Sequence, residues 1–429
     1  MKSINSRYAG CVLAVIISAV APHARAGVTT NLGHISGAQC VAVDINDTGT
    51  AAGVCTPGSV NLPTVPWIAM AGAEVSLTVP VAGKACGVSG ISNSGSVIGQ
   101  CDYGNNQFYA VTWAGSGASP LKLAPLSGLL GLASDVSSRA TAYNDQGFVG
   151  GQSVGAAPAV NSTAVVWAPN SATATQVSSA GDNCVLSDVQ SGGSGNPTVV
   201  VNCPTTPLLG TTITNQPKVA TWTGVGYTMT VLPNPPLPAG APPANVEQCM
   251  ASSINASGQV LGTCRYDAPP RSRAVRWSGS PLVGQALTLA AGGNPVLTVG
   301  AAMNDAGHVV YAYQDVNGKS GVGYWEPGTG KQLLVPRISP GGPGVQANSI
   351  VLAGFGSNDR IVINGETGDG HIAAASIDPT SASPSLIVEP LLSGGSNEIA
   401  TAVSKSGAVA AGSADDGTHE SNAVVYSLP

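Results

Sequence analysis

The sequence predicts an all-β fold, an eight-bladed β-propeller of four-stranded blades that closes by sharing one blade between the N- and C-termini. Three observations support this prediction. Cysteines are paired symmetrically around turns, one turn motif recurs about every fifty residues, and all tryptophans occupy one position of that repeat. Charged residues make up only 9% of the chain, and small residues dominate, which suits stacked sheets joined by turns better than helices.

The cysteines indicate β-hairpins whose two strands are joined by a disulfide. The chain has nine cysteines. Cys11 lies among the first 26 residues, so eight cysteines lie in residues 27–429. Each of these has a partner at the mirror position around a turn, where two thiols on neighbouring strands come within disulfide reach. The predicted disulfides are Cys40 with Cys55, Cys86 with Cys101, Cys184 with Cys203, and Cys249 with Cys264. Such bridges favour an oxidising compartment.

The same hairpin pattern continues where cysteine is missing. Each copy consists of an alternating strand, a polar turn that ends in Gly, and a second alternating strand, as in Asn144-Asp145-Gln146-Gly147. The predicted hairpins cover residues 40–55, 86–101, 138–153, 184–203, 249–264, 298–313, 351–366 and 398–413. The copy at 351–366 is the weakest, because it has neither Cys nor Trp.

The tryptophans test this register independently. Trp67, Trp113 and Trp325 each lie 18 residues after the turn Gly of their copy, and the other three tryptophans hold corresponding places. Most of them end a short β run, and a further apolar segment follows each one. One repeat is therefore predicted to contain four strands, with Trp at the end of the third.

The two ends of the chain complete the argument for a ring. Residues 28–32 resemble a lone fourth strand, and residues 423–426 resemble a third strand. A chain with such ends can close by pairing them in one blade, which leaves no open inner edge. We therefore expect one repeat domain over residues 27–429. Seven blades, or a β-solenoid, are the alternatives.

The first 26 residues have the pattern of a secretory signal peptide. Lys2 and Arg7 precede the short apolar run 11–20, and Ala24-Arg25-Ala26 forms a small-x-small cleavage site. The protein is thus expected to be secreted or periplasmic after cleavage near Ala26. The net charge is −6, and we find no basic stretch and no later apolar run long enough to span a membrane. We expect no nucleic-acid partner and no membrane span in the mature chain.

The repeats resemble a known family. Copies of the form Ile-Asn-x-x-Gly-x-Val-x-Gly, best at residues 45–53, 91–99 and 254–262, are similar to bacterial extracellular repeats of the HAF type. The sequence departs from the motif that names the family, because Tyr109-Ala110-Val111 stands where His-Ala-Phe is typical. The resemblance implies an exported tandem-repeat protein and carries no catalytic residues.

One polar group suggests a ligand-binding rim. Polar side chains follow the second strand of several repeats and should gather on one face of a propeller; they are Asp102, Tyr103, Arg265, Tyr266, Asp267 and Asp315. Calcium is the one cofactor that such carboxylates would suit, and we expect no other cofactor and no dedicated metal site.

No catalytic residue is predicted. Gly151-Gln152-Ser153-Val154-Gly155 matches the nucleophile elbow of serine hydrolases, but that motif requires a strand-turn-helix context. Alignment places Ser153 where Cys55 stands and Ser138 where Cys40 stands, so a structural role explains the match. The sequence therefore favours a non-enzymatic binding or surface-interaction module, with an extracellular glycan or protein as partner. The alternatives are a polysaccharide-acting enzyme, with carboxylates from different blades, and a structural cell-surface protein.

The disulfides generate a first prediction. Each bridge that closes a loop of about 15 residues contributes roughly 3 kcal/mol in the chain-entropy model. Reduction should therefore lower the melting temperature markedly, while circular dichroism below that temperature still shows native sheet content. A melting curve that does not respond to reductant would contradict the predicted bridges.

Overall fold

A computed structural model describes residues 27–429, apart from residues 34, 36–37, 59–62, 71, 105–106, 128–134, 157–160, 194, 206–213, 237–245, 268–270, 288–296, 315–319, 336–349, 367–369 and 419. The described residues form 32 β-strands. Among them no helix is long and apolar enough to cross a membrane. The predicted signal peptide and the candidate rim residue Asp315 lie outside the described residues.

The strands form six four-stranded sheets and one eight-stranded sheet. The eight-stranded sheet consists of two four-stranded groups joined by a single parallel bridge between Ser272 and Leu297. We therefore describe eight four-stranded units and number them in chain order. This architecture confirms the predicted all-β, propeller-like class.

The strand bounds are as follows. Unit 1 contains β2 (Ala38–Ile45), β3 (Ala51–Pro57), β4 (Val65–Met70) and β5 (Ala73–Ser76); unit 2 contains β6 (Cys86–Ile91), β7 (Val97–Asp102), β8 (Phe108–Trp113) and β9 (Leu121–Lys122). Unit 3 contains β10 (Ser137–Tyr143), β11 (Val149–Val154), β12 (Ser162–Trp167) and β13 (Ala174–Gln176); unit 4 contains β14 (Val185–Val189), β15 (Val199–Thr205), β16 (Thr214–Trp222) and β17 (Tyr227–Val231). Unit 5 contains β18 (Val246–Ile254), β19 (Val260–Tyr266), β20 (Arg271–Ser278) and β21 (Val283–Ala286); unit 6 contains β22 (Leu297–Met303), β23 (Val309–Gln314), β24 (Ser320–Trp325) and β25 (Gln332–Leu334). Unit 7 contains β26 (Val351–Phe355), β27 (Ile361–Glu366), β28 (Ile372–Ile377) and β29 (Ile387–Val388); unit 8 contains β30 (Glu398–Val403), β31 (Val409–Asp415), β32 (Ser421–Ser427) and β1 (Thr29–Gly33).

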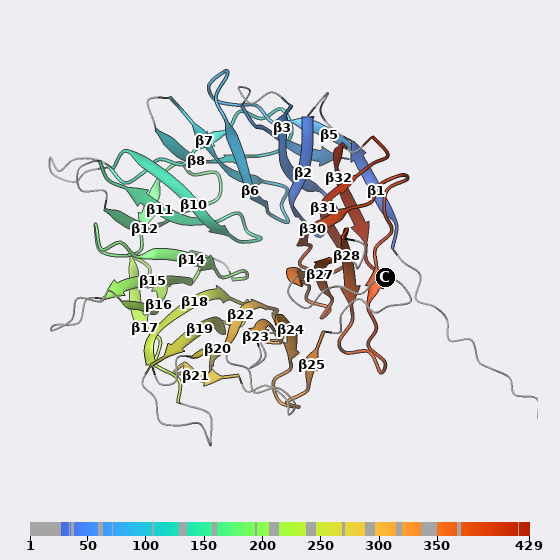
Figure 1. Cartoon of the computed structure of the whole chain (residues 1–429). Helices are drawn as coiled ribbons and strands as arrows, with labels where there is room; N and C mark the ends of the chain where they lie inside the picture. Colours follow the sequence, from blue (N-terminus) through green and yellow to red (C-terminus); the bar gives the residue numbers. More distant parts are fainter. Residues whose placement is uncertain are drawn as a thin grey trace, which may run out of the picture.

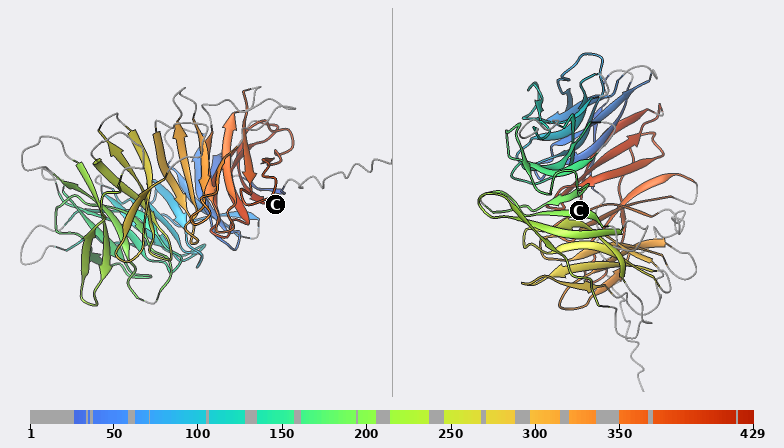
Figure 2. Two further views of the ribbon diagram at one scale, coloured as in Figure 1. Left: turned by 90° about the horizontal axis from the view of Figure 1, so that it is seen from below. Right: turned by 90° about the vertical axis from the view of Figure 1, so that its left-hand side faces the viewer.

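The units follow one another around a central axis (Figure 1). The labelled first strands, among them β10, β14, β18 and β22, lie closest to this axis, and fourth strands such as β17 and β21 lie at the periphery. The two further views show the strands fanned side by side, with turns and connections at their ends (Figure 2). One end of each unit therefore carries the turn between its first and second strands.

Unit 8 joins the two ends of the described chain. β1 pairs antiparallel with β32, with Thr29 opposite Tyr426 and Thr30 opposite Val425. Beyond the strand, the Val28 amide donates to Ser427 Oγ at 2.8 Å, and the Ser427 amide donates to Val28 O at 3.0 Å. The shared sheet is the arrangement that the split ends of the sequence predict.

The cysteine pairs form four disulfides, each within one hairpin: Cys40–Cys55, Cys86–Cys101, Cys184–Cys203 and Cys249–Cys264. Unit 3 has no bridge, and its register places Ser138 opposite Ser153, in the positions of the cysteines. The serine hydroxyls instead bond to the connection that precedes unit 3, with Ser138 Oγ donating to Leu123 O and Ser153 Oγ accepting from the Leu126 amide at 2.8 Å.

The tryptophans fill the space between neighbouring units. Trp113, Trp167 and Trp277 are fully buried, and each donates its indole N–H to a carbonyl of the preceding unit's connection, at Thr78, Ala124 and Pro233. A buried indole usually finds such a partner because an unpaired N–H is costly. The repeat position of Trp is therefore an inter-unit packing position.

The turns between first and second strands explain the recurrent glycine. Gly49, Gly95, Gly147, Gly258, Gly307 and Gly407 all have φ between 74° and 85°. In unit 7 the turn runs over residues 356–359 and Asp359 takes the glycine's place at φ 64°. Asp is one of the few non-glycine residues that adopt this left-handed backbone conformation with only a modest energetic penalty. The weakest repeat thus keeps the same turn with a different residue.

Candidate functional site

The first strands of units 4 to 8 expose apolar side chains beside the axis. They are Val185 (43% exposed), Met250 (47%), Leu297 (36%), Val299 (39%), Val351 (61%) and Ile399 (37%). The corresponding strands of units 1 to 3 expose Gln39, Ser89 and Arg139 instead. Clustered exposed apolar side chains commonly mark a binding surface. The apolar half of the inner strands is thus the candidate region.

A groove lies within this region, between units 7 and 8. It has a volume of about 440 Å³ and is lined by Val351, Asn364, Gly365, Glu366, Gly370, Ile372 and Ile399. Three strands supply its aliphatic wall, because Val351 begins β26, Ile372 begins β28 and Ile399 lies on β30. Glu366, at the end of β27, adds a carboxylate to the lining.

Asn364 holds the two sides of this groove together. Its side-chain amide donates to Ala400 O at 2.7 Å, and its carbonyl oxygen accepts from the Ala400 amide at 2.8 Å. Asn202 and Ala251 make the same double contact between units 4 and 5. The groove is therefore built on a rigid inter-unit clamp.

The turns between first and second strands lie at the end of the axis opposite the groove between units 7 and 8. Hydrogen bonds connect the turns of successive units: Asn46 Nδ2 to Ser92 O, Asn144 Nδ2 to Gln190 O, Gln190 Nε2 to Ala256 O, Asn255 Nδ2 to Asn304 O, Asn304 Nδ2 to Asp359 Oδ1, Ser357 N to Lys405 O, and Ser406 N to Asp47 Oδ1. The Asn at the first turn position therefore has two roles: it shapes its own turn, and its side-chain amide donates a hydrogen bond to the turn of the next unit.

Lys405 joins turns from three units. Its ammonium group lies 2.7 Å from Asp145 Oδ2 of unit 3 and 3.3 Å from Asp305 Oδ2 of unit 6. Burial alone would lower the pKa of Lys405, but the two carboxylates hold it above its usual value. We call Lys405, Asp145 and Asp305 the axial cluster.

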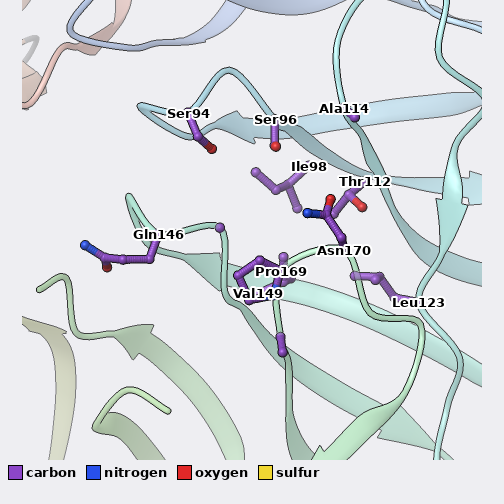
Figure 3. Close-up of a pocket in the computed structure, with 12 residues that line it drawn as sticks. Ser94, Ser96, Ile98, Thr112, Ala114, Leu123, Gln146, Val149, Pro169 and Asn170 are labelled. Carbon is purple, nitrogen blue, oxygen red and sulfur yellow. The ribbon is translucent and has the colours of Figure 1, made fainter. Parts of the chain in front are cut away.

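The series of turn contacts is interrupted between units 2 and 3. Ser92 stands where units 1, 3, 5 and 6 have Asn, and its short side chain bonds locally to Ser94 Oγ at 2.8 Å. No hydrogen bond joins these two turns in the described part of the chain. A groove of about 340 Å³ lies there, lined among others by Ser96, Thr112 and Asn170. Figure 3 shows Ser94 and Ser96 on one side of it, and Pro169 and Asn170 on the other.

Two buried carboxylates occupy the same position of the repeat. Asp44 accepts from the Ile91 amide at 2.8 Å and contacts the Tyr143 hydroxyl, and Asp188 accepts from the Ile254 amide at 2.7 Å. Burial raises the pKa of Asp188 to about 7, although these hydrogen bonds and Lys405 oppose the rise. Both residues follow a β-bulge in a first strand, which turns their side chains toward the next unit.

The described candidate rim residues fall into two separate groups. Asp102 and Tyr103 belong to unit 2, and residues 265–267 belong to unit 5, so units 3 and 4 lie between them. Asp102 pairs with Lys84 at 3.5 Å, and Arg265 pairs with Glu247 at 2.7 Å. Tyr266 is 1% exposed. A ligand role for these residues therefore stays a prediction.

Ser153 has no histidine partner among the residues that the structure describes. Its hydroxyl donates to Asp135 Oδ2 at 2.5 Å, and it lies near the end of β11, opposite Ser138, rather than at a strand-turn-helix corner. Two groups have metal-ligand spacing, one around Cys40, Cys55 and Glu74 and the other around Asp182, Cys184 and Cys203. All four sulfurs are in disulfides and are not thiolate ligands.

No family model and no curated protein matches the chain. Membership of the HAF-type repeats therefore stays a prediction. Among solved structures, a prolyl endopeptidase is 11% identical over 82% of this chain and 50% of that chain, with a TM-score of 0.52. A post-proline cleaving enzyme from Rickettsia typhi is 9% identical, over 82% and 53%, with a TM-score of 0.50. The propeller domain of the Trilobed protease from Pyrococcus furiosus is 10% identical, over 82% and 96%, with a TM-score of 0.48.

The two matches with TM-scores of 0.50 and above show a shared fold, and the chain spans about half the length of those two peptidases. The comparisons contradict the expectation of a non-enzymatic binding or surface-interaction module, because the two solved structures with TM-scores of 0.50 or more are a prolyl endopeptidase and a post-proline cleaving enzyme.

The axial cluster should stabilise the ring measurably. Replacing Lys405 with Met leaves Asp145 and Asp305 without their cation, and partly exposed pairs of this kind contribute about 1 kcal/mol. We expect the melting temperature of Lys405→Met to fall by about 2 °C in low salt. The deficit should shrink in 1 M NaCl, because salt screens such pairs. Lys331→Met is the matched control, and an equal loss in both variants would contradict the assignment.

Asp188 should give the protein a pH-dependent stability. A carboxyl whose folded pKa is raised stabilises the fold below its unfolded pKa, near 4, and that contribution is lost as pH rises through about 7. The melting temperature of Asp188→Asn relative to wild type should therefore rise by a few degrees between pH 5 and pH 8. Asp416→Asn, whose parent carboxyl has a pKa of about 2, should show no such trend. Parallel pH profiles for wild type and Asp188→Asn would refute the role of Asp188.

Proposed function

We propose that the mature chain is an exported propeller of the peptidase type. Its role would be to bind peptide substrates that are then hydrolysed. One observation carries the proposal. The groove between units 7 and 8 presents three exposed aliphatic side chains, Val351, Ile372 and Ile399. An aliphatic side chain of an extended peptide is the kind of group that such a groove can remove from water.

The strands around the groove also suit an extended backbone. β26 is the end strand of its sheet, so the edge that faces away from β27 is not paired within that sheet. Peptides commonly add to such edges, where main-chain hydrogen bonds give affinity and side-chain pockets give selectivity.

Export is the second part of the proposal. The predicted signal peptide and the four disulfides support a periplasmic or extracellular location after cleavage near Ala26. Substrates would then be peptides outside the cytosol. The fold shared with prolyl endopeptidases supports peptide hydrolysis as the reaction that this propeller serves.

Peptide binding can be tested with a fluorescein-labelled Lys-Pro-Val-Leu-Pro-Val peptide. Anisotropy should show saturable binding to the mature protein, and Val351→Asp combined with Ile399→Asp should weaken it at least about tenfold, because charges replace the aliphatic wall. Val283→Asp is the control, since Val283 is 59% exposed on the peripheral strand β21.

Circular dichroism should show that all three proteins are folded, as these side chains are exposed. Absence of saturable binding by wild type, or an equal loss in the Val283→Asp control, would reject the groove as the peptide site.

A further inference from the structure

Two buried glutamates lie at the junction of units 7 and 8 without a cation in contact. Glu389 is 2% exposed and Glu398 is 1% exposed. Glu389 Oε1 accepts from Ser376 Oγ at 2.8 Å, and Glu398 Oε1 accepts from the Ala374 amide at 3.2 Å. The second carboxylate oxygen of each has no good hydrogen bond within the described residues. A buried carboxylate without a counter-ion is costly, so this arrangement requires an explanation.

The other charged and titratable groups nearby do not supply that partner. Arg360 acts on Glu389 only through its field, and its guanidinium contacts Pro429 O. The Tyr426 hydroxyl is buried and has no partner among the described residues. Burial raises the pKa of both glutamates, that of Glu398 to about 8. In the structure as described, then, no ammonium or guanidinium group pairs with Glu389.

Gly27 lies directly against Glu389. A Cβ on Gly27 would sit 3.0 Å from Glu389 Oε2 and 1.7 Å from the Ser427 carbonyl oxygen, so only glycine fits there. The Gly27 nitrogen approaches the carboxylate closely enough to lower its pKa, without making a well-formed bond to Oε2. The contacts of Val28 with Ser427 hold this segment in place.

The predicted cleavage site is the bond before this glycine. Hydrolysis of the Ala26–Gly27 peptide bond consumes one water and leaves a carboxylate on Ala26. The nitrogen of Gly27, an amide in the precursor, becomes an α-ammonium group with a positive charge and three donors. The new charge therefore arises at the atom that lies beside Glu389.

We propose that the α-ammonium group of Gly27, created by removal of residues 1–26, is the counter-ion of Glu389 and fastens β1 into unit 8. This inference rests on the export that the proposed function includes. It makes the stability of the closed ring depend on processing, because the charge that pairs with Glu389 does not exist in the precursor. It also gives the glycine after the cleavage site a structural role.

The test compares two otherwise identical proteins cut from fusions by a site-specific protease. One begins at Gly27, and the other retains residues 24–26, so that the nitrogen of residue 27 stays an amide. We expect the form that begins at Gly27 to melt at least about 3 °C higher at pH 7. In Glu389→Gln the difference between the two forms should vanish, because the neutral amide cannot pair with the ammonium group. Ser376→Ala is the matched control, since it removes a neighbour of Glu389 without its charge and should keep the difference.

Three results would overturn the inference. They are equal melting temperatures of the two forms, a difference that persists in Glu389→Gln, and an exported protein whose N-terminus by mass spectrometry is not Gly27. Peptide binding measured on the form that begins at Gly27 reports on the groove separately. A failed ion pair and a failed peptide site are therefore distinguishable.

Discussion

The antiparallel pairing of β1 with β32 is the constraint on which the rest of the structure depends. Seven units contain four consecutive strands, and only unit 8 takes strands from both ends of the chain. The pairing places residues nearly 400 positions apart in adjacent strands, as in the contact of Val28 with Ser427. The pairing adds to direct contacts between units 1 and 8, such as those of Thr401 Oγ1 with Ala42 O and of the Ser406 amide with Asp47 Oδ1.

The second constraint acts at the axis, where the turns meet. A side-chain amide at the first turn position links a turn to the next one, as Asn46 does with Ser92 O and Asn255 with Asn304 O. Where the residue is Ser92, the link is missing and a groove takes its place. At the other end, the identity of the exposed first-strand residues decides which part of the axis is apolar.

Much of the fold could be predicted because its signals are local and periodic. The disulfides, the turn glycines and the tryptophans each depend on spacing within one unit, and the hairpin register pairs Cys40 with Cys55 and Ser138 with Ser153. The candidate site could not be predicted in this way. Val351, Ile372 and Ile399 come from three strands of two units, and none of them belongs to a motif. The predicted rim carboxylates share a place in the repeat. A shared repeat position puts residues of different units on the same face, but it does not bring them into contact.

The sequence by itself determined the class of fold, the strand content of each unit, the positions of the disulfides and the expectation that the ends meet. These properties follow from backbone geometry and from the two-residue period of strands, which act over short distances along the chain. Only the tertiary structure decided that Lys405 meets Asp145 and Asp305, that aliphatic side chains of units 7 and 8 form a groove, and that Gly27 lies against Glu389. Such contacts join residues from different units, and they depend on how the sheets pack around the axis, which no local pattern encodes.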